Sequence, residues 1–243
     1  TARFGHVTVR MAEGVLACGG CNGHDKRGHS ALTSCEFIPL PSKIASMSGS
    51  WLMMDKETSK VACRTSAWQE MLPMNTPRLC ASACCLPNGD VMISGGAKGL
   101  DMSGLGIVTS TSEILTRKDC SDGHSTLQWK SGPAMLSGRI MHTLAYNNGI
   151  IYAVGGMDVN KNAVGKTVSS KVLSTVEILP LDMKSGNVTG VWAALPNLPM
   201  ALHSASVVPY GESILVCGGI CSNGTKNQLI LSFDLKNQEW VTI

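Results

Sequence analysis

Gly14-Val15-Leu16-Ala17-Cys18-Gly19-Gly20 is an apolar run that ends in a glycine doublet, and the arrangement recurs three times further along the chain. The later copies are Val91-Met92-Ile93-Ser94-Gly95-Gly96, Ile150-Ile151-Tyr152-Ala153-Val154-Gly155-Gly156 and Ile214-Leu215-Val216-Cys217-Gly218-Gly219. Short runs rich in Val, Ile and Leu that end in Gly are typical of β-strands. A glycine doublet lets the backbone adopt positive φ or approach another backbone closely. The four copies therefore predict four equivalent structural units.

The segments that follow each doublet also recur in a fixed order. After a variable loop comes a short apolar strand that carries Glu36, Glu113 or Glu177 in the first three units, and reads Leu231-Ser232-Phe233-Asp234 in the fourth. A Trp follows in each unit, and a Pro-rich turn closes the first three. Each unit thus predicts a four-stranded antiparallel meander. One such sheet cannot bury both of its faces alone, so the units are expected to stack on their neighbours.

This order of features resembles the kelch repeat, and the resemblance covers essentially all of residues 1–243. It implies an all-β, kelch-type β-propeller with four four-stranded antiparallel blades, from repeats at about 1–72, 73–133, 134–196 and 197–243. The first glycines of successive doublets lie 76, 60 and 63 residues apart, more than the kelch period of about 50. The excess falls in loops 39–67, 97–110 and 157–172. Kelch rings usually have more than four blades, which favours a segment of a larger ring over a closed four-bladed one.

The glycine doublets and tryptophans are predicted to be structural. The glycines suit the crowded inner end of a blade, and each Trp supplies a large apolar plate between adjacent sheets. These residues are Gly19, Gly20, Gly95, Gly96, Gly155, Gly156, Gly218, Gly219, Trp68, Trp129, Trp192 and Trp240.

Arginine recurs just before the first strand of three repeats, as Arg3, Arg78 and Arg139, while the fourth repeat has Met200 near that place. Equivalent positions lie at one height around a ring, so three guanidinium groups should circle one mouth. In kelch substrate adaptors an Arg at this position can reach an acidic peptide, and its planar fork binds carboxylates bidentately. The three arginines are therefore candidate partner-binding residues. If so, Arg78→Ala and Arg139→Ala should weaken partner binding and spare stability. The alternative is a structural Arg that ties adjacent blades together.

Other polar residues repeat in the same regular way. His6, His142 and His203 follow the Arg position, and residues spread over successive blades favour core or hydrogen-bonding roles over a metal site. The repeated glutamates are expected to be structural, because chemistry needs one asymmetric constellation. Cys18 and Cys21 have the spacing of half a zinc site that His24 and His29 could complete, but buried thiols are favoured. No catalytic residue, metal ligand or cofactor is assigned.

Composition limits the possible partners and compartments. The net charge of +3 is too small to predict nucleic-acid binding, and no apolar stretch approaches the roughly 18 residues of a membrane span. Several of the ten cysteines lie in strand-like runs, which favours free thiols in the cytoplasm or another reducing compartment.

The sequence thus predicts a non-catalytic protein-interaction module or scaffold that binds a partner protein or an acidic peptide at one rim. This function rests on the family resemblance and on the lack of catalytic motifs, because fold alone does not imply function. Two alternatives remain open: an enzyme of the kelch type, such as a sugar epimerase or an oxidase, and a structural subunit of a large cytoskeletal or organellar assembly. If the ring is incomplete, exposed inter-blade faces are expected to cause self-association.

Overall fold

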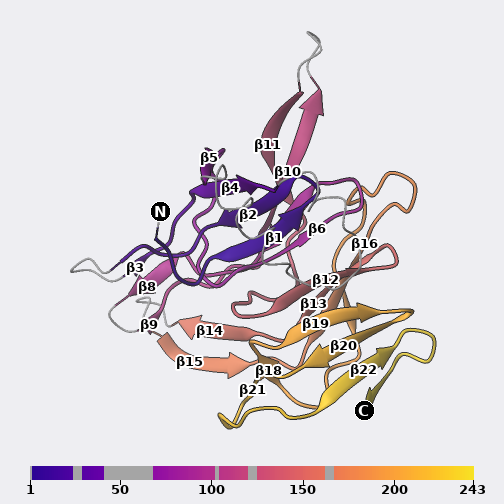
Figure 1. Ribbon diagram of the computed structural model, residues 1–243. Helices are drawn as coiled ribbons and strands as arrows, with labels where there is room; N and C mark the ends of the chain where they lie inside the picture. The colour runs from indigo at the N-terminus through magenta and orange to yellow at the C-terminus, as the bar shows by residue number, and fades with distance from the viewer. Residues whose placement is uncertain (1, 24–28, 41–67, 102–103, 120–124, 162–166) are drawn as a thin grey trace, which may run out of the picture.

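The computed structural model of the chain describes residues 2–23, 29–40, 68–101, 104–119, 125–161 and 167–243, and these residues form strands and turns (Figure 1). Sixteen of the strands make four antiparallel sheets, each of four strands, and these sheets follow one another along the chain. The fold is therefore all-β, with four blades arranged as in a propeller, as the sequence predicts.

Each blade is a meander in which consecutive blade strands pair. Blade 1 contains β1 (Val7–Met11), β2 (Gly14–Cys18), β4 (Cys35–Pro39) and β5 (Gln69–Met71). Blade 2 contains β6 (Ser82–Cys85), β7 (Val91–Ser94), β10 (Ser112–Asp119) and β11 (Ser125–Gly132). Blade 3 contains β12 (Thr143–Asn147), β13 (Ile150–Val154), β16 (Val176–Pro180) and β17 (Ala193–Leu195). Blade 4 contains β19 (Ser206–Tyr210), β20 (Ser213–Cys217), β22 (Ile230–Asp234) and β23 (Glu239–Thr242).

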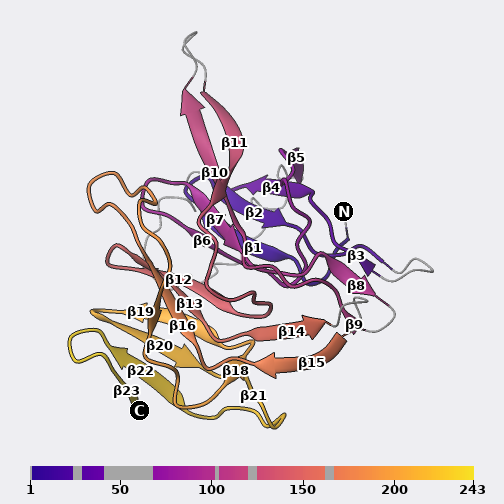
Figure 2. The ribbon, with the colours of Figure 1, turned by 180° about the vertical axis from the view of Figure 1, so that it is seen from behind.

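The loops that follow the glycine doublets contain strands of their own. In blades 1 and 2 they form a shared sheet from β3 (His29–Ser30), β8 (Gly99–Asp101) and β9 (Gly104–Leu105). In blade 3 the loop is a hairpin of β14 (Met157–Lys161) and β15 (Thr167–Val172). In blade 4 the loop contains β21 (Ile220–Cys221), which pairs with β18 (Leu202–His203) in the turn before the blade's first strand. Figures 1 and 2 place β3, β8, β9, β14 and β15 on one side of the molecule. These segments, which the sequence predicts as loops, therefore build one structured rim.

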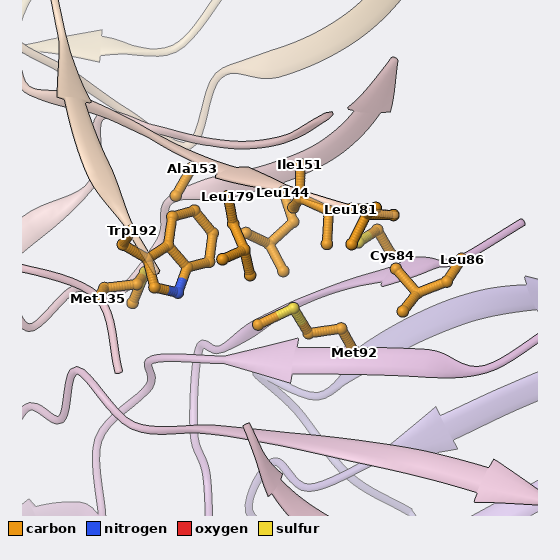
Figure 3. Close-up of a cluster of buried hydrophobic side chains, with 10 residues drawn as sticks. All are labelled: Cys84, Leu86, Met92, Met135, Leu144, Ile151, Ala153, Leu179, Leu181 and Trp192. Carbon is orange, nitrogen blue, oxygen red and sulfur yellow. The ribbon is translucent and has the colours of Figure 1, made fainter. Parts of the chain in front are cut away.

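Three apolar clusters fill the spaces between consecutive blades. The cluster between blades 2 and 3 joins Cys84, Leu86 and Met92 of blade 2 to residues of blade 3 such as Leu144, Ile151 and Trp192 (Figure 3). The others lie between blades 1 and 2, around Leu16, Ile93 and Trp129, and between blades 3 and 4, around Tyr152, Leu202 and Phe233. Burial between neighbouring sheets is what stacks the blades, because each sheet has two apolar faces to cover.

A ladder of backbone hydrogen bonds also links the blades, two residues after each Arg position. Cys80 N–H donates to the Gly5 carbonyl, Met141 N–H to the Cys80 carbonyl, and Ser204 N–H to the Met141 carbonyl. All four residues have positive φ, between 52° and 60°. Left-handed backbone is costly for residues other than glycine. The inter-blade hydrogen bonds hold three such residues in this conformation.

Candidate functional site

Arg139 lies in a fully buried frame of hydrogen bonds at the start of blade 3. Its guanidinium donates to the carbonyl oxygens of Gly155 and Thr175 at 2.8 and 3.0 Å and pairs with the Glu177 carboxylate. Glu177 also accepts hydrogen bonds from the N–H groups of Leu136 and Ser137, at 2.7 and 3.1 Å. One ion pair therefore fixes the turn that leads into the blade, the end of its second strand and its third strand.

Arg78 repeats this frame at the start of blade 2. It pairs with Glu113 at 3.1 Å and donates to the carbonyls of Gly95 and Thr111, while Glu113 accepts from the N–H groups of Asn75 and Thr76. Burial lowers the pKa of Arg78, and the Glu113 carboxylate opposes that effect. The arginine stays charged because its ordinary pKa is above 12.

Arg3 makes the same contacts in blade 1. Its guanidinium donates to the carbonyls of Gly19 and Ser34, both at 2.9 Å, and pairs with Glu36 at 3.0 Å. All three arginines thus hold their own blades, which is the geometry of the structural alternative. Buried and paired guanidinium groups are poorly placed to reach an acidic peptide. Partner binding by Arg3, Arg78 and Arg139 stays a prediction that the contacts do not favour.

The fourth repeat replaces the ion pair with apolar residues. Leu202 takes the Arg position, because its carbonyl accepts from Gly156 N–H as the Arg139 carbonyl accepts from Gly96 N–H. Met200, which the sequence analysis places near this position, lies two residues before it. Leu231 takes the Glu position, since it pairs with Val216 as Glu177 pairs with Ala153.

Two further changes accompany this replacement. Pro199, which has no N–H, stands where Leu136 donates to Glu177. The side-chain amide of Asn227 donates to the carbonyls of Gly218 and Leu229 at 2.9 and 3.0 Å, as Arg139 does to the corresponding carbonyls of blade 3. At these positions, therefore, blade 4 lacks the carboxylate, the guanidinium and one backbone N–H donor together, so neither charge is left buried without its partner.

The first glycine of each doublet is required where a following blade is present. A Cβ at Gly155 would lie 2.3 Å from the Leu202 carbonyl oxygen, and a Cβ at Gly19 or Gly95 would lie 2.4 Å from the equivalent oxygen of the next blade. A Cβ at Gly218 would meet no atom within 4 Å, although its φ of +67° matches the others. The first glycine of three doublets thus serves inter-blade contact, and the first glycine of the fourth faces open space.

Gly155→Ala is expected to lower the free energy of unfolding by about 2 kcal/mol more than Gly218→Ala. Both changes place a side chain in left-handed backbone, at a shared cost of roughly 1–2 kcal/mol. Only the Gly155 change also forces blades 3 and 4 apart. Urea unfolding of the two variants measures the difference, and equal losses would mean that the doublets act through backbone conformation alone.

The tryptophans bridge each blade to the turn before it. The indole N–H groups of Trp129, Trp192 and Trp240 donate to the carbonyls of Leu72, Pro133 and Pro196, at 2.9, 3.1 and 2.9 Å. Trp129 and Trp192 are buried, whereas Trp68 in blade 1 is 49% exposed.

The outward faces of the first and last blades carry exposed apolar side chains. Trp68 lines an open pocket of about 210 Å³ with Arg3, His6, Thr8, Ala17 and Glu36 on blade 1. On blade 4, Val208 and Tyr210 are 48% and 70% exposed, whereas their counterparts Cys84 and Leu86 in blade 2 are buried against blade 3. No described residue packs a further blade against either face.

The histidines occupy different positions. His142 is buried, and its Nε2 lies 3.1 Å from the Ser94 hydroxyl. Burial, with the charges of Arg139 and Arg78, lowers the pKa of His142 to about 3, so the ring is neutral at pH 7.

His203 directly follows Leu202, so it lies two residues before the position in blade 4 that corresponds to His142. Within the described part of the chain, no three His, Cys, Asp or Glu side chains lie close enough to hold a metal ion. His24 lies outside the described residues.

The structured rim exposes apolar and basic side chains. Leu136 and Ile107 are 62% and 60% exposed on the loops of blades 3 and 2. Lys98 and Lys171 are exposed close to the doublets of the same blades. Nothing in the sequence distinguished these residues, because loop positions carry no periodicity; the only sequence signal is their place beside a doublet.

Comparisons with known proteins support the fold and the repeat type. No family model matches the chain. It is 27% identical over 112 residues to kelch-like protein 15 of Danio rerio, and 29% identical over 112 residues to kelch-like protein 35 of Mus musculus. In both cases the match covers 46% of the chain but only 17% of the relative. The structure of YjhT superposes on the whole chain with a TM-score of 0.60 and 12% identity, and the chain covers 66% of it. The chain thus has a kelch-type propeller fold and resembles the kelch-repeat family over about half its length.

None of the described segments is a helix with the length and apolar character needed to cross a membrane.

Proposed function

We propose that this kelch-type propeller is a non-catalytic protein-interaction module that binds a partner protein at the structured rim. The observation that carries the proposal is the shared construction of that rim: loops of blades 1 and 2 pair through β3 and β8, and the blade 3 loop is a hairpin. Loops on a rigid frame are where binding residues are commonly found. The buried Arg–Glu pairs supply such a frame, which limits the ordering cost of binding.

The chemistry of the rim indicates the kind of partner. Leu136 and Ile107 offer apolar contacts, and the exposed Lys98 and Lys171 offer positive charge to carboxylates. Asp158 is the backbone register partner of Lys171 across the hairpin. An acidic partner segment with apolar anchors fits this surface. In this form of the proposal Arg78 and Arg139 position the rim, and the lysines meet the acidic groups.

Leu136→Asp is expected to remove a stoichiometric partner from affinity capture out of native extract, and Lys98→Glu with Lys171→Glu to weaken its binding at least tenfold. All three side chains are exposed, so the fold should tolerate the changes. The matched controls are Met183→Asp and Lys184→Glu in the exposed turn between β16 and β17, and both should retain the partner.

Each other outcome points to a different function. Retention of the partner by Leu136→Asp would reject the rim, and loss with Met183→Asp would place binding on the opposite side. Capture of many subunits together would support a structural role in an assembly. Capture of no protein would favour the enzyme alternative.

The open faces of blades 1 and 4 further support self-association of this chain. Exposed Val208 and Tyr210 correspond to residues that are buried between blades elsewhere, and such faces tend to associate. Sedimentation velocity is expected to show concentration-dependent oligomers, and Val208→Glu with Tyr210→Glu should shift the chain to monomer. A compact wild-type monomer at all concentrations would contradict this expectation.

A further inference from the structure

Cys18 and Cys35 face each other directly across the two central strands of blade 1. Cys18 is the last residue of β2 and Cys35 the first of β4, and the two are register partners in the antiparallel pair. Both side chains are 1% exposed and belong to the apolar cluster between blades 1 and 2. Sixteen residues separate them in the sequence.

The position within the ladder decides how close the two thiols lie. Gly19 N–H donates to the Ser34 carbonyl at 3.1 Å, so the neighbouring pair of residues is the hydrogen-bonded one. Cys18 and Cys35 therefore form a non-hydrogen-bonded pair, in which the Cα atoms are about 4.5 Å apart and the side chains are closer than in the alternate pairs. A disulfide requires Cα atoms within roughly 4.4–6.8 Å. The backbone thus already has a spacing that a disulfide needs.

The two thiols also influence each other electrostatically. The neighbouring Cys35 thiol, together with burial, raises the pKa of the Cys18 thiol. The Cys35 thiol also lies 3.6 Å from the Thr33 carbonyl as a donor. Among the four blades, only blade 1 has cysteine at both of these register positions. The corresponding pairs are Ser94 with Ser112, Val154 with Val176, and Cys217 with Ile230.

We propose that Cys18 and Cys35 are a disulfide-forming pair that links β2 to β4 when the chain meets a disulfide oxidant such as oxidised glutathione. One thiolate attacks a glutathione sulfur, which forms a protein–glutathione mixed disulfide and releases one glutathione thiolate. The second cysteine, as thiolate, attacks the protein sulfur of that intermediate and releases the other glutathione. Two protein thiols are oxidised to one disulfide, one glutathione disulfide is reduced to two thiols, and the two protons are transferred to the glutathione thiolates or solvent.

Burial determines when this exchange occurs. The thiolate is the attacking species, and both the raised pKa of Cys18 and the closed inter-blade face oppose its formation in the folded state. The disulfide therefore forms during folding or through local opening of blade 1, and once formed it is protected. Because Cys18 directly precedes Gly19, the disulfide would also fix the start of the loop that contributes β3 to the structured rim.

The test is disulfide mapping of the whole chain. The protein is unfolded and reduced, refolded in glutathione buffers of graded ratio, quenched in acid, alkylated with N-ethylmaleimide in denaturant and digested for mass spectrometry. The disulfide-linked peptide that contains Cys18 and Cys35 is expected to form under more reducing conditions than any other linked peptide. The reduced-to-oxidised glutathione ratio at which its amount reaches half of the maximum should be at least tenfold higher than the corresponding ratio for any other cysteine pair.

Variants separate this pair from the remaining cysteines. Cys35→Ser should abolish the linked peptide and the rise in thermal midpoint that oxidation gives the wild type, whereas Cys217→Ser should preserve both. Cys217 is the matched control because it occupies the Cys18 position in blade 4, opposite Ile230. Linkage of Cys18 to Cys21 instead, or recovery of Cys18 and Cys35 as alkylated thiols from the most oxidising buffer, would overturn the proposal.

Discussion

Arg139→Ala is expected to lower the free energy of unfolding by about 3–5 kcal/mol, because it leaves the Glu177 carboxylate buried without its counter-ion. Arg139 is fully buried, and its hydrogen bonds to the carbonyls of Gly155 and Thr175 are lost as well. Chemical denaturation monitored by tryptophan fluorescence measures the change. The sequence-based expectation was the opposite, that this variant would spare stability; a loss below about 1 kcal/mol would restore that expectation.

Blade 4 supplies the control for this experiment. The triple variant Leu136→Pro, Arg139→Leu, Glu177→Leu copies the arrangement of Pro199, Leu202 and Leu231. Because apolar residues can replace a buried ion pair at little cost, the triple variant should be more stable than Arg139→Ala despite its two further changes. A triple variant less stable than Arg139→Ala would show that blade 3 depends on the charge pair itself.

Trp192→Ala is expected to cost about 3–5 kcal/mol of unfolding free energy, the range for truncating a large buried aromatic side chain. The ring is 4% exposed beside Met135 and Ala153 in the cluster between blades 2 and 3, and its N–H donates to the Pro133 carbonyl (Figure 3). Trp129→Ala should behave alike, because Trp129 is also buried and bonded to the turn before its blade.

Trp68→Ala is the matched control for both variants. Its side chain holds the same repeat position but is about half exposed, so its removal should cost less than about 1 kcal/mol. Urea titration compares the three variants. Similar losses at Trp68 and Trp192 would indicate that the face of blade 1 is covered in solution, and a small loss at Trp192 would mean that the repeat alignment is wrong.

The repeated features of the fold could be predicted because they are local. The doublets, the strands before them and the Trp positions recur with enough regularity to predict four meanders, and the described residues form four four-stranded sheets. The fourth Arg-equivalent position could have been located more closely from the sequence. Trp68 and Arg78 are ten residues apart, as are Trp129 and Arg139, and ten residues after Trp192 is Leu202.

The rim could not be predicted, because it depends on contacts between distant segments. β3 pairs with β8 across about seventy residues of sequence, and no local sequence pattern predicts that pairing. A recurring Arg signals equivalence by repeat but not whether it faces solvent or its own blade. The repeated glutamates were correctly placed in the same units, and the pairing of the two series would have indicated the buried frame.

The ladder through Gly5, Cys80, Met141 and Ser204 has a consequence for cooperativity. The peptide groups beside Cys80 and Met141 each donate to the preceding blade and accept from the following one, so every link joins nearest neighbours in chain order. Stability in such a chain is a sum of blade and interface contributions, and opening starts at the ends, where a blade has one neighbour instead of two. Blades 1 and 4 should therefore fray first, and the amide protons of blades 2 and 3 should exchange with solvent most slowly.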